Sequence, residues 1–531
     1  MNNDILIIGG GISGLTTAAY LAKNNIPVTL IEKNDQVGGL IGSFYKDGFL
    51  FDKGIRATEN SGSLFPMLRD LNIDLKFLEN IVTIKIGDKS VRVIDDNSLT
   101  EYSKMLCEIY PNDTNEIKQI IELIDKISQY MEVLYGIDNP LFLDMKNDRD
   151  YLVKTVLPWM AKFNKTIKKI EKLNIAVDEY LKKITNNESL IDMIIQHFFK
   201  DTPTFFALSY FRLYKDYYYP EGGTKSLIDA LENYITSNGG KIIINTEITD
   251  VVLKDNIAKS GDKEFHFSKL VWAADLKTLY RVVDVKNAKN FNLKKYNDKK
   301  NLILNSHGND SIYSLFVATN LPPTYYKGKC SEHNFYTPIL DGLSSMKISA
   351  IQLIDKLKNS KSDKKELLTS WLIEFANKTT YEISIPVLRD KTLAPENKSA
   401  VIISAVFDYD LTSYLYNENL YEFFKETFNK AIIDTLDTYL YPEFKENITD
   451  NFSSSPMTIE KHLNNSDGAI TGWSFTGKIP VESRMKKMGK AIDTPFNDII
   501  QTGHWVFSPT GMPTSLIIGK LSADRIIKKY K

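Results

Sequence analysis

The sequence predicts an α/β fold whose nucleotide-binding half begins within the first ten residues. Residues 5–8 are a short run of branched apolar side chains, which is typical of a buried parallel strand. A G-x-G-x-x-G pattern follows at once, formed by Gly9, Gly11 and Gly14. Small and apolar residues then recur at helical spacing, and a second apolar run over residues 28–31 ends at Glu32. This order of strand, glycine turn, helix and strand predicts a Rossmann-type unit.

Each part of this unit has a physical role in holding a dinucleotide. The first glycine permits a tight turn, the second lets the backbone approach a pyrophosphate, and the third lets helix and strand pack closely. Unpaired N–H groups at the helix start, around Ile12 and Ser13, attract phosphate oxygens. Glu32 can bind ribose hydroxyls and would repel a 2′-phosphate, which disfavours NADP. Although such patterns also occur by chance in loops, this context predicts a nucleotide site that extends to Lys33.

A second glycine pair bears on the choice between FAD and NAD. Gly38 and Gly39 follow shortly after the acid. Their spacing resembles the signature of the flavoprotein superfamily that includes amine oxidases and carotenoid desaturases, in which an extra loop wraps the far side of the FAD pyrophosphate. The residue that follows is usually arginine in that superfamily and is Leu40 here. The resemblance implies FAD as the cofactor, and the alternative is a plain glycine turn.

Further segments resemble phytoene desaturases and carotenoid isomerases, and they occur in the order of that family. The matching segments are residues 48–56, 218–227, 270–275, 456–473 and 499–513. The resemblance implies that the flavin cofactor is contacted by Gly54, Ile55, Arg56, Ile248, Gly503, Gly511, Met512 and Pro513. In the last segment, N–H groups at a helix start would stabilise electron density on the flavin. The family's usual triple glycine in that segment is reduced here to S-P-T-G over residues 508–511.

The resemblance also implies a discontinuous domain organisation. A Rossmann-type FAD-binding domain, like that of glutathione reductase, would comprise residues 1–85, 218–285 and 456–531. An α+β substrate domain would comprise residues 86–217 and 286–455, where the sequence matches the family only in general pattern.

Candidate catalytic residues come from the same resemblance. Arg56 and Glu221 are expected near the flavin, and His504 lies within the C-terminal flavin segment. Arg56 could place positive charge against an anionic reduced flavin or simply form an ion pair, and His504 could assist proton transfer or only hydrogen-bond a turn. No residue is assigned as the acid or base. No Ser/His/Asp set, metal-binding motif or P-loop is visible, and no metal is expected.

The substrate half is expected to be helical over residues 114–200. Residues 114–136 form an amphipathic pattern, and residues 176–199 are expected to be helical as well. A charge-rich stretch over 356–365 is expected to be an exposed loop. An aromatic-rich stretch could line a slot for an elongated apolar substrate or could be ordinary core; it contains Phe205, Phe206, Tyr210, Phe211, Tyr214, Tyr217, Tyr218 and Tyr219.

Residues 157–173 combine an apolar stripe, which includes Trp159 and Phe163, with lysines on the opposite side. Such a helix can lie in an anionic membrane interface or be an ordinary surface helix. Lysine plus arginine (66) nearly equals aspartate plus glutamate (67), which disfavours a nucleic-acid partner. With two cysteines, no leader pattern and no long apolar run, we expect a cytoplasmic protein that contacts a membrane at most peripherally.

The resemblance implies hydride transfer between the flavin N5 and a C–C bond of an apolar substrate. The substrate would be a polyene, an isoprenoid or another lipid-like molecule, and the reaction a desaturation, saturation or isomerisation. Because no second dinucleotide unit is visible, electrons would pass to oxygen, a quinone or another external acceptor or donor, or return to the substrate. The alternatives are an amine-oxidase-like enzyme acting on a C–N bond and a non-catalytic relative, like the Rab GDP-dissociation inhibitors, that binds a prenylated partner.

Overall fold

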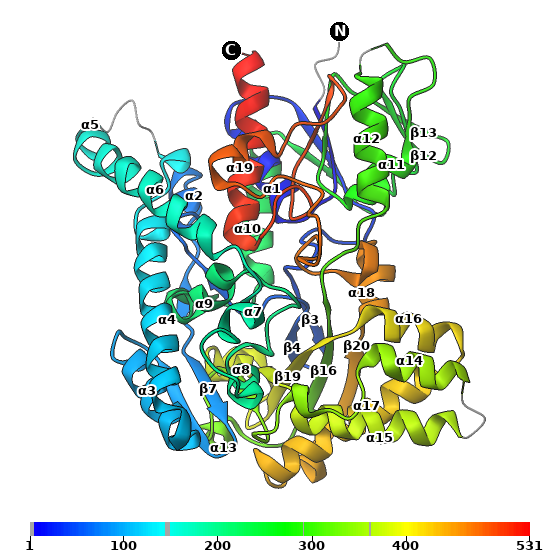
Figure 1. The fold of residues 1–531 in the computed structure, drawn as a ribbon. Coiled ribbons are helices and arrows are strands. Elements are labelled where there is room, and N and C mark those ends of the chain that lie inside the picture. Colours follow the sequence, from blue (N-terminus) through cyan, green and yellow to red (C-terminus); the bar gives the residue numbers. More distant parts are fainter. Residues whose placement is uncertain (1–4, 144–148, 290, 360–362, 531) are drawn as a thin grey trace.

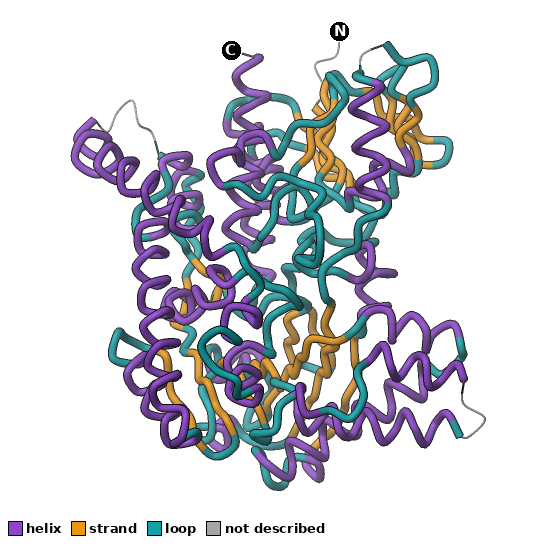
Figure 2. Tube along the Cα trace, viewed as in Figure 1, coloured by secondary structure: helices purple, strands orange, loops and turns teal. Residues whose placement is uncertain are grey.

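The computed structural model describes residues 5–143, 149–289, 291–359 and 363–530. Strands gather in two regions, and the middle of the molecule between them is built largely from loops (Figure 2). The upper region of Figure 1 contains both ends of the chain. Its centre is a five-stranded parallel sheet of order β10-β2-β1-β14-β21, with bounds Lys241–Ile243, Val28–Ile31, Ile5–Ile8, Lys269–Trp272 and Ile499–Gln501.

Strand β1 is buried on both faces, as its continuous apolar run predicts. Ile5 and Ile7 face a helical layer formed by α1 (Ile12–Lys23), α10 (Lys225–Ser237) and α19 (Met512–Tyr530). Leu6 and Ile8 face the opposite layer. That layer contains the antiparallel sheet β11 (Asp250–Val252), β12 (Ile257–Ser260) and β13 (Lys263–His266), edged by β15 (Val283–Asp284), and the helices α11 (Leu276–Val282) and α12 (Leu293–Leu304).

The lower region is built on a seven-stranded mixed sheet of order β20-β16-β19-β18-β17-β7-β8. The bounds in that order are Ile448–Ser454, Ser311–Thr319, Ser399–Phe407, Tyr381–Ser384, His333–Thr337, Val82–Ile86 and Lys89–Val93. One face packs on helices α14 (Ala350–Asn359), α15 (Lys364–Lys378), α16 (Tyr409–Asn417) and α17 (Tyr421–Tyr439), with the short α13 (Pro323–Tyr326) alongside. The opposite face supplies residues to the site described below.

A helical layer covers the end of this sheet where β7 and β8 lie (Figure 1). It consists of α3 (Ser98–Ile109), α4 (Thr114–Tyr135), α6 (Leu157–Ile170), α7 (Val177–Leu181), α8 (Glu188–Ile195) and α9 (Thr204–Leu213). The three-residue α5 (Arg149–Tyr151) and the π-helix η3 (Leu152–Val156) precede α6. Among the remaining elements, α2 (Leu64–Asp70) packs on the parallel-sheet half, and α18 (Pro456–Leu463) lies beside β16 and β20.

Two small sheets join the halves. The hairpin of β3 (Ser43–Lys46) and β4 (Phe49–Asp52) packs on β19, and β9 (Tyr217–Pro220) pairs with both β5 (Thr58–Glu59) and β6 (Phe77–Glu79).

Most elements expected from the sequence are present, and three differ. The helix expected over 176–199 is broken into α7 and α8 by a turn at residues 182–187. The stretch 356–365 is not simply a loop, because α14 runs to Asn359 and α15 begins at Lys364, while residues 360–362 lie outside the described ranges.

The third difference concerns the expected domain boundaries. Strand β7 already belongs to the seven-stranded sheet at Val82, so the chain enters that sheet before residue 85. Helix α12 packs in the cluster under the parallel sheet, so residues 293–304 lie with the nucleotide-binding half and not with the substrate half.

Candidate flavin site and substrate cavity

A cavity of about 410 Å³ runs from the glycine turn of the parallel sheet to the seven-stranded sheet. Its wall includes residues expected to contact a cofactor, namely Gly9, Gly11, Ile12, Ser13, Glu32, Lys33, Gly38, Gly39, Leu40, Gly54, Ile55, Arg56, Ile248, Gly503, Gly511 and Met512. Gly14 and Pro513 lie outside the wall. The cavity therefore brings together segments from both ends and the centre of the chain.

The glycine turn has space on the cavity side and none on the sheet side. A Cβ on Gly11 would meet no heavy atom within 4 Å, so the backbone there is open to the cavity. A Cβ on Gly14 would overlap the carbonyl oxygen of Gly9, which explains its place in the packing between α1 and β1. Gly9 adopts a φ of +106°, which favours glycine. The turn therefore has the shape that approach to a pyrophosphate requires.

The carboxylate of Glu32 is held by backbone groups at the rim of this turn. Its Oε2 accepts a hydrogen bond from Gly10 N at 2.7 Å, and its Oε1 accepts one from Asn34 N at 2.9 Å. Each oxygen keeps a second lone pair, which can accept a ribose hydroxyl. Ile248 also lines the cavity.

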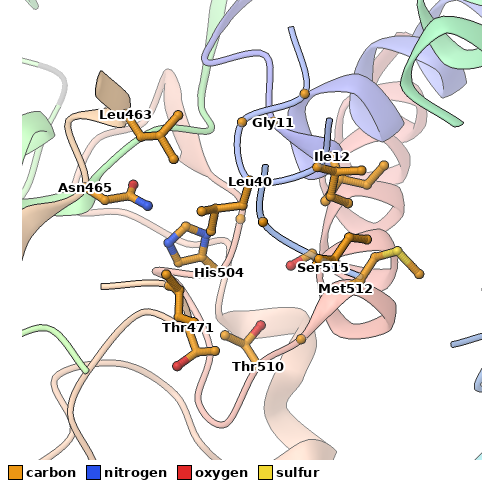
Figure 3. Close-up of a pocket in the computed structure, with 18 of the residues that line it drawn as sticks. Gly11, Ile12, Leu40, Leu463, Asn465, Thr471, His504, Thr510, Met512 and Ser515 are labelled. Carbon is orange, nitrogen blue, oxygen red and sulfur yellow. The ribbon is translucent and has the colours of Figure 1, made fainter. Parts of the chain in front are cut away.

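The C-terminal segment holds unpaired polar atoms next to the cavity. Within the described residues, the buried side-chain atoms without a hydrogen-bond partner include His504 Nε2 and Thr510 Oγ1, and both residues line the cavity. The His504 ring lies beside Leu40 and Thr471 (Figure 3). Since buried polar groups normally have partners, these atoms fit a bound group with hydrogen-bonding edges, as an isoalloxazine has. Burial lowers the pKa of His504 to about 4, so the ring is neutral near pH 7.

The other two catalytic candidates have different surroundings. Arg56 is 1% exposed, and its guanidinium donates to the backbone carbonyls of Asp52 and Gly54 and to the hydroxyls of Ser314 and Ser404. Glu221 lies outside the cavity wall and forms an exposed ion pair with Lys76, at 2.5 Å between Nζ and Oε1. The turn after β9 thus directs the Glu221 side chain to the surface and away from the wall of this cavity.

The sequence left open whether the aromatic stretch lines a substrate slot or belongs to the core, and different residues of the stretch do each. Four of its members line the cavity: Phe206, Tyr210, Tyr214 and Tyr217. The other four do not; Phe205 and Phe211 are buried in the helical layer, and Tyr219 donates to Asp52 Oδ2 at 2.8 Å. Within α9 the helical period explains the division, because Phe206 and Tyr210, four residues apart, share the face toward the cavity, whereas Tyr217–Tyr219 belong to strand β9. Behind the lining rings is a small apolar cavity of about 30 Å³, which shares six wall residues with the large one.

The structure adds ionisable residues that the sequence did not single out. Glu59, His197, His333 and Glu382 all line the cavity. Burial, helped by the charge of Asp216, raises the pKa of Glu59 to about 7. Burial lowers the pKa of His197 to about 4. No local motif marks these residues. Glu59 comes three residues after the motif segment 48–56, whereas the other three lie in the substrate half, where the sequence matches the family only in general pattern.

Among the described residues, no group of three or more histidine, cysteine, aspartate or glutamate side chains is placed to hold a metal ion. None of the helices in the described part of the chain combines the length and the hydropathy needed to cross a bilayer.

Comparisons with known proteins identify the family of this chain. The family described as flavin containing amine oxidoreductase matches residues 12–376, and the chain belongs to this family. A prolycopene isomerase from an Oncidium hybrid cultivar is 23% identical over 98% of this chain and 83% of its own. A 4,4'-diapophytoene desaturase of Staphylococcus haemolyticus is 25% identical over 51% of this chain and 55% of its own. The chain spans about half the length of the first curated relatives that it matches.

Solved structures support the fold. A putrescine oxidase variant superposes with a TM-score of 0.61 at 14% identity, covering 99% of both chains. Family membership confirms the predicted fold class, a flavin-dependent oxidoreductase and FAD as the cofactor. The open backbone at Gly11 and the unpaired atoms of His504 and Thr510 fit that group.

Proposed function

We propose that this oxidoreductase transfers hydride between the flavin N5 and a C–C bond of an apolar substrate, as a desaturase, saturase or isomerase. The observation that carries the proposal is the shared cavity: the aromatic rings of Phe206, Tyr210 and Tyr214 line the same space as the C-terminal flavin segment. The names of the relatives, a desaturase and an isomerase of polyenes, support the same substrate class.

Bound FAD supplies the two-electron chemistry. Desaturation removes a hydride from one carbon and a proton from its neighbour, saturation adds both, and isomerisation returns what it removes. The aromatic wall would orient the apolar chain and exclude water. Glu59, whose pKa lies near 7, can hold or release a proton at its carboxyl group in this cavity, while Arg56 and His504 remain candidates for roles near the flavin. Net oxidation requires an external acceptor such as oxygen or a quinone.

The proposal is tested by anaerobic mixing of FAD-loaded protein with polyenes, isoprenoids and amines. Loss of the long-wavelength flavin absorbance with an apolar polyene or isoprenoid is the expected result for a desaturase. In parallel, pre-reduced protein is mixed with cis- and trans-polyenes and the products are separated, since an isomerase or a saturase acts from that state. Reaction with amines alone would contradict the proposal.

A second candidate function is oxidation of a C–N bond. Two carboxylates on the cavity wall, Glu59 and Glu382, support it because they could attract a cationic amine. The same anaerobic experiment separates the two candidates. A non-catalytic prenyl-binding role is less well supported, because the glycine turn and Glu32 keep the features that nucleotide binding needs.

We also propose a cytoplasmic protein that contacts membranes peripherally through α6 and the π-helix η3 that precedes it. This segment projects from the body of the molecule (Figure 1). Val153, Leu157 and Met160 expose apolar side chains there, and Lys162 and Lys165 are exposed nearby. An exposed apolar stripe flanked by lysines suits an anionic lipid interface.

A further inference from the structure

The seven-stranded sheet carries a polar row on its cavity-side face, and Glu382 and Ser404 of this row line the cavity. Cross-strand register places Ser314, Ser404 and Glu382 side by side on β16, β19 and β18, with Phe335 next on β17. Side chains one residue along each strand point to the opposite face, where Leu315, Ile403 and their neighbours form a hydrophobic core. The polar row therefore belongs to the cavity side alone.

Arg56 covers one end of this row. Its Nη2 donates to Ser404 Oγ at 3.0 Å and to Ser314 Oγ at 3.3 Å, and its Nη1 donates to two backbone carbonyls. These bonds anchor the loop after β4 to the sheet. The two Nη atoms are therefore bonded within the protein, whereas Nε is buried without a hydrogen-bond partner, and the charge of the guanidinium acts on Glu382 across the row.

Only one of the two carboxylate oxygens of Glu382 has a close partner in the protein. His333 Nε2 lies 3.0 Å from its Oε1, and Asn80 Nδ2 approaches the other nitrogen of that ring at 3.4 Å. Within the described residues, no donor reaches Glu382 Oε2. The side chain is 32% exposed although β18 is an interior strand, because it faces the cavity.

This carboxyl group is ionised. Burial raises its pKa, but the His333 ring 3.0 Å away and the positive charges of Arg56 and Arg389 outweigh burial and bring the pKa below its ordinary value, while burial lowers the pKa of His333 and keeps that ring neutral near pH 7. An anionic oxygen thus faces the same space as the aromatic wall, and the Phe335 ring lies 5.2 Å from that of Tyr214. A pure hydrocarbon covering Glu382 would remove water from this oxygen and give no hydrogen bond in return, which is costly for a charged group.

We propose that the substrate is an apolar molecule with a hydrogen-bond-donating polar group, a hydroxyl or an ammonium, that binds Glu382 Oε2. The inference rests on the proposed function, since it concerns the ligand of the same cavity, and it narrows the substrate class. Pure hydrocarbons are excluded as preferred ligands. The apolar part of the molecule lies along the Phe206–Tyr217 wall, and the polar group fixes which C–C or C–N bond faces the flavin.

The test measures binding to FAD-loaded protein through perturbation of the flavin spectrum, with four ligands of one isoprenoid chain length. They are the primary alcohol, the primary amine, the methyl ether and the hydrocarbon. We expect the alcohol or the amine to bind about tenfold or more tightly than the ether and the hydrocarbon, because a hydrogen bond to a charged group supplies that much. A preference for the amine identifies an ammonium ligand, and a preference for the alcohol a hydroxyl ligand.

Variants assign the preference to Glu382. In Glu382→Gln, the preference for the amine should disappear and that for the alcohol should fall several-fold, while Glu122→Gln, an exposed change on α4, should leave both unchanged. Flavin content and thermal unfolding check that Glu382→Gln is folded.

Equal affinity for all four ligands, or a preference that survives Glu382→Gln, would overturn the inference and leave the proposed function standing. If Glu382→Gln lowers stability without changing the preference, Glu382 serves only to hold the loop of Arg56. Binding of none of the four would overturn the proposed function together with the inference.

Discussion

The hydroxyl of Ser13 donates a hydrogen bond of 2.7 Å to the carbonyl of Ser515, 502 residues further along the chain. Four residues on, Thr17 Oγ1 repeats the contact with the carbonyl of Gly519 at 3.0 Å. The first and last helices of the described chain, α1 and α19, are thus joined side by side beneath the cavity. The start of each helix supplies cavity wall, so the geometry of the cofactor site depends on this contact.

Gly519 should be intolerant of any side chain, because a Cβ there would come within 2.7 Å of Ser13 O and 2.9 Å of Thr16 Cβ. We expect Gly519→Ala to destabilise the protein by about 1–3 kcal/mol, typical of overpacking, and to weaken FAD retention. Thermal unfolding with and without added FAD measures both effects. Gly489→Ala is the control, since a Cβ at Gly489 meets nothing within 4 Å; equal stability of the two variants would contradict the packing argument.

Gly11 and Gly14 should differ sharply when each is replaced by valine. Gly11→Val adds a side chain toward the open cavity, so the protein should fold but bind no FAD. Gly14→Val drives a side chain into the carbonyl of Gly9, so folding itself should fail. Soluble yield, far-UV circular dichroism and flavin absorbance distinguish the two outcomes. A yellow Gly11→Val protein would show that the pyrophosphate does not approach this turn.

Glu59 should make stability depend on pH. Its pKa is raised from 4.5 in the unfolded chain to about 7 in the folded state, so the folded state keeps a proton that the unfolded state has lost. Stability is therefore fully present below pH 4.5 and declines as the pH rises through 7, above which a poorly solvated carboxylate is left in the cavity.

Glu59→Gln removes this dependence. We expect the FAD-free variant to be about 1–3 kcal/mol more stable than the parent at pH 8.5, allowing for screening by cavity water, and equal to it near pH 4.5. Urea unfolding at both pH values measures the difference, with the exposed Glu122→Gln as the control. A stability gap that is the same at both pH values would mean that Glu59 does not titrate in this range.

The nucleotide-binding half was predictable because its information is local. Strand β1 and helix α1 occupy the residues that the apolar runs and glycines predict, since each glycine there meets a backbone requirement within a few residues. The cavity wall was not predictable in the same way. Glu382 and Ser404 become neighbours only through strand pairing, and they lie in the half where the sequence matches the family only in general pattern. The surface position of Glu221 was not predictable for a related reason, because a motif locates a turn but not the direction of each side chain on it.

The last prediction concerns the proposed membrane contact of α6, for which the structure indicates different test residues from those that the sequence suggests. Trp159 Nε1 donates to Val133 O at 2.5 Å, and the Trp159 ring packs 4.8 Å from that of Phe163, so these two side chains fix α6 on α4. Serine at these positions, a natural choice from the sequence, would loosen the fold whether or not a membrane is bound. The exposed stripe of Val153, Leu157 and Met160 is the better target.

Replacing all three with glutamine should leave the melting temperature within about 2 °C of the parent, since surface changes cost little, while binding to anionic liposomes should fall about tenfold or more. Vesicle sedimentation at low and moderate salt measures the binding. The matched control replaces Ile351 and Tyr416, which are exposed on α14 and α16 at the opposite side of the molecule, with glutamine. If both variants bind liposomes as the parent does, the lysines of α6 face water and the segment is an ordinary surface helix.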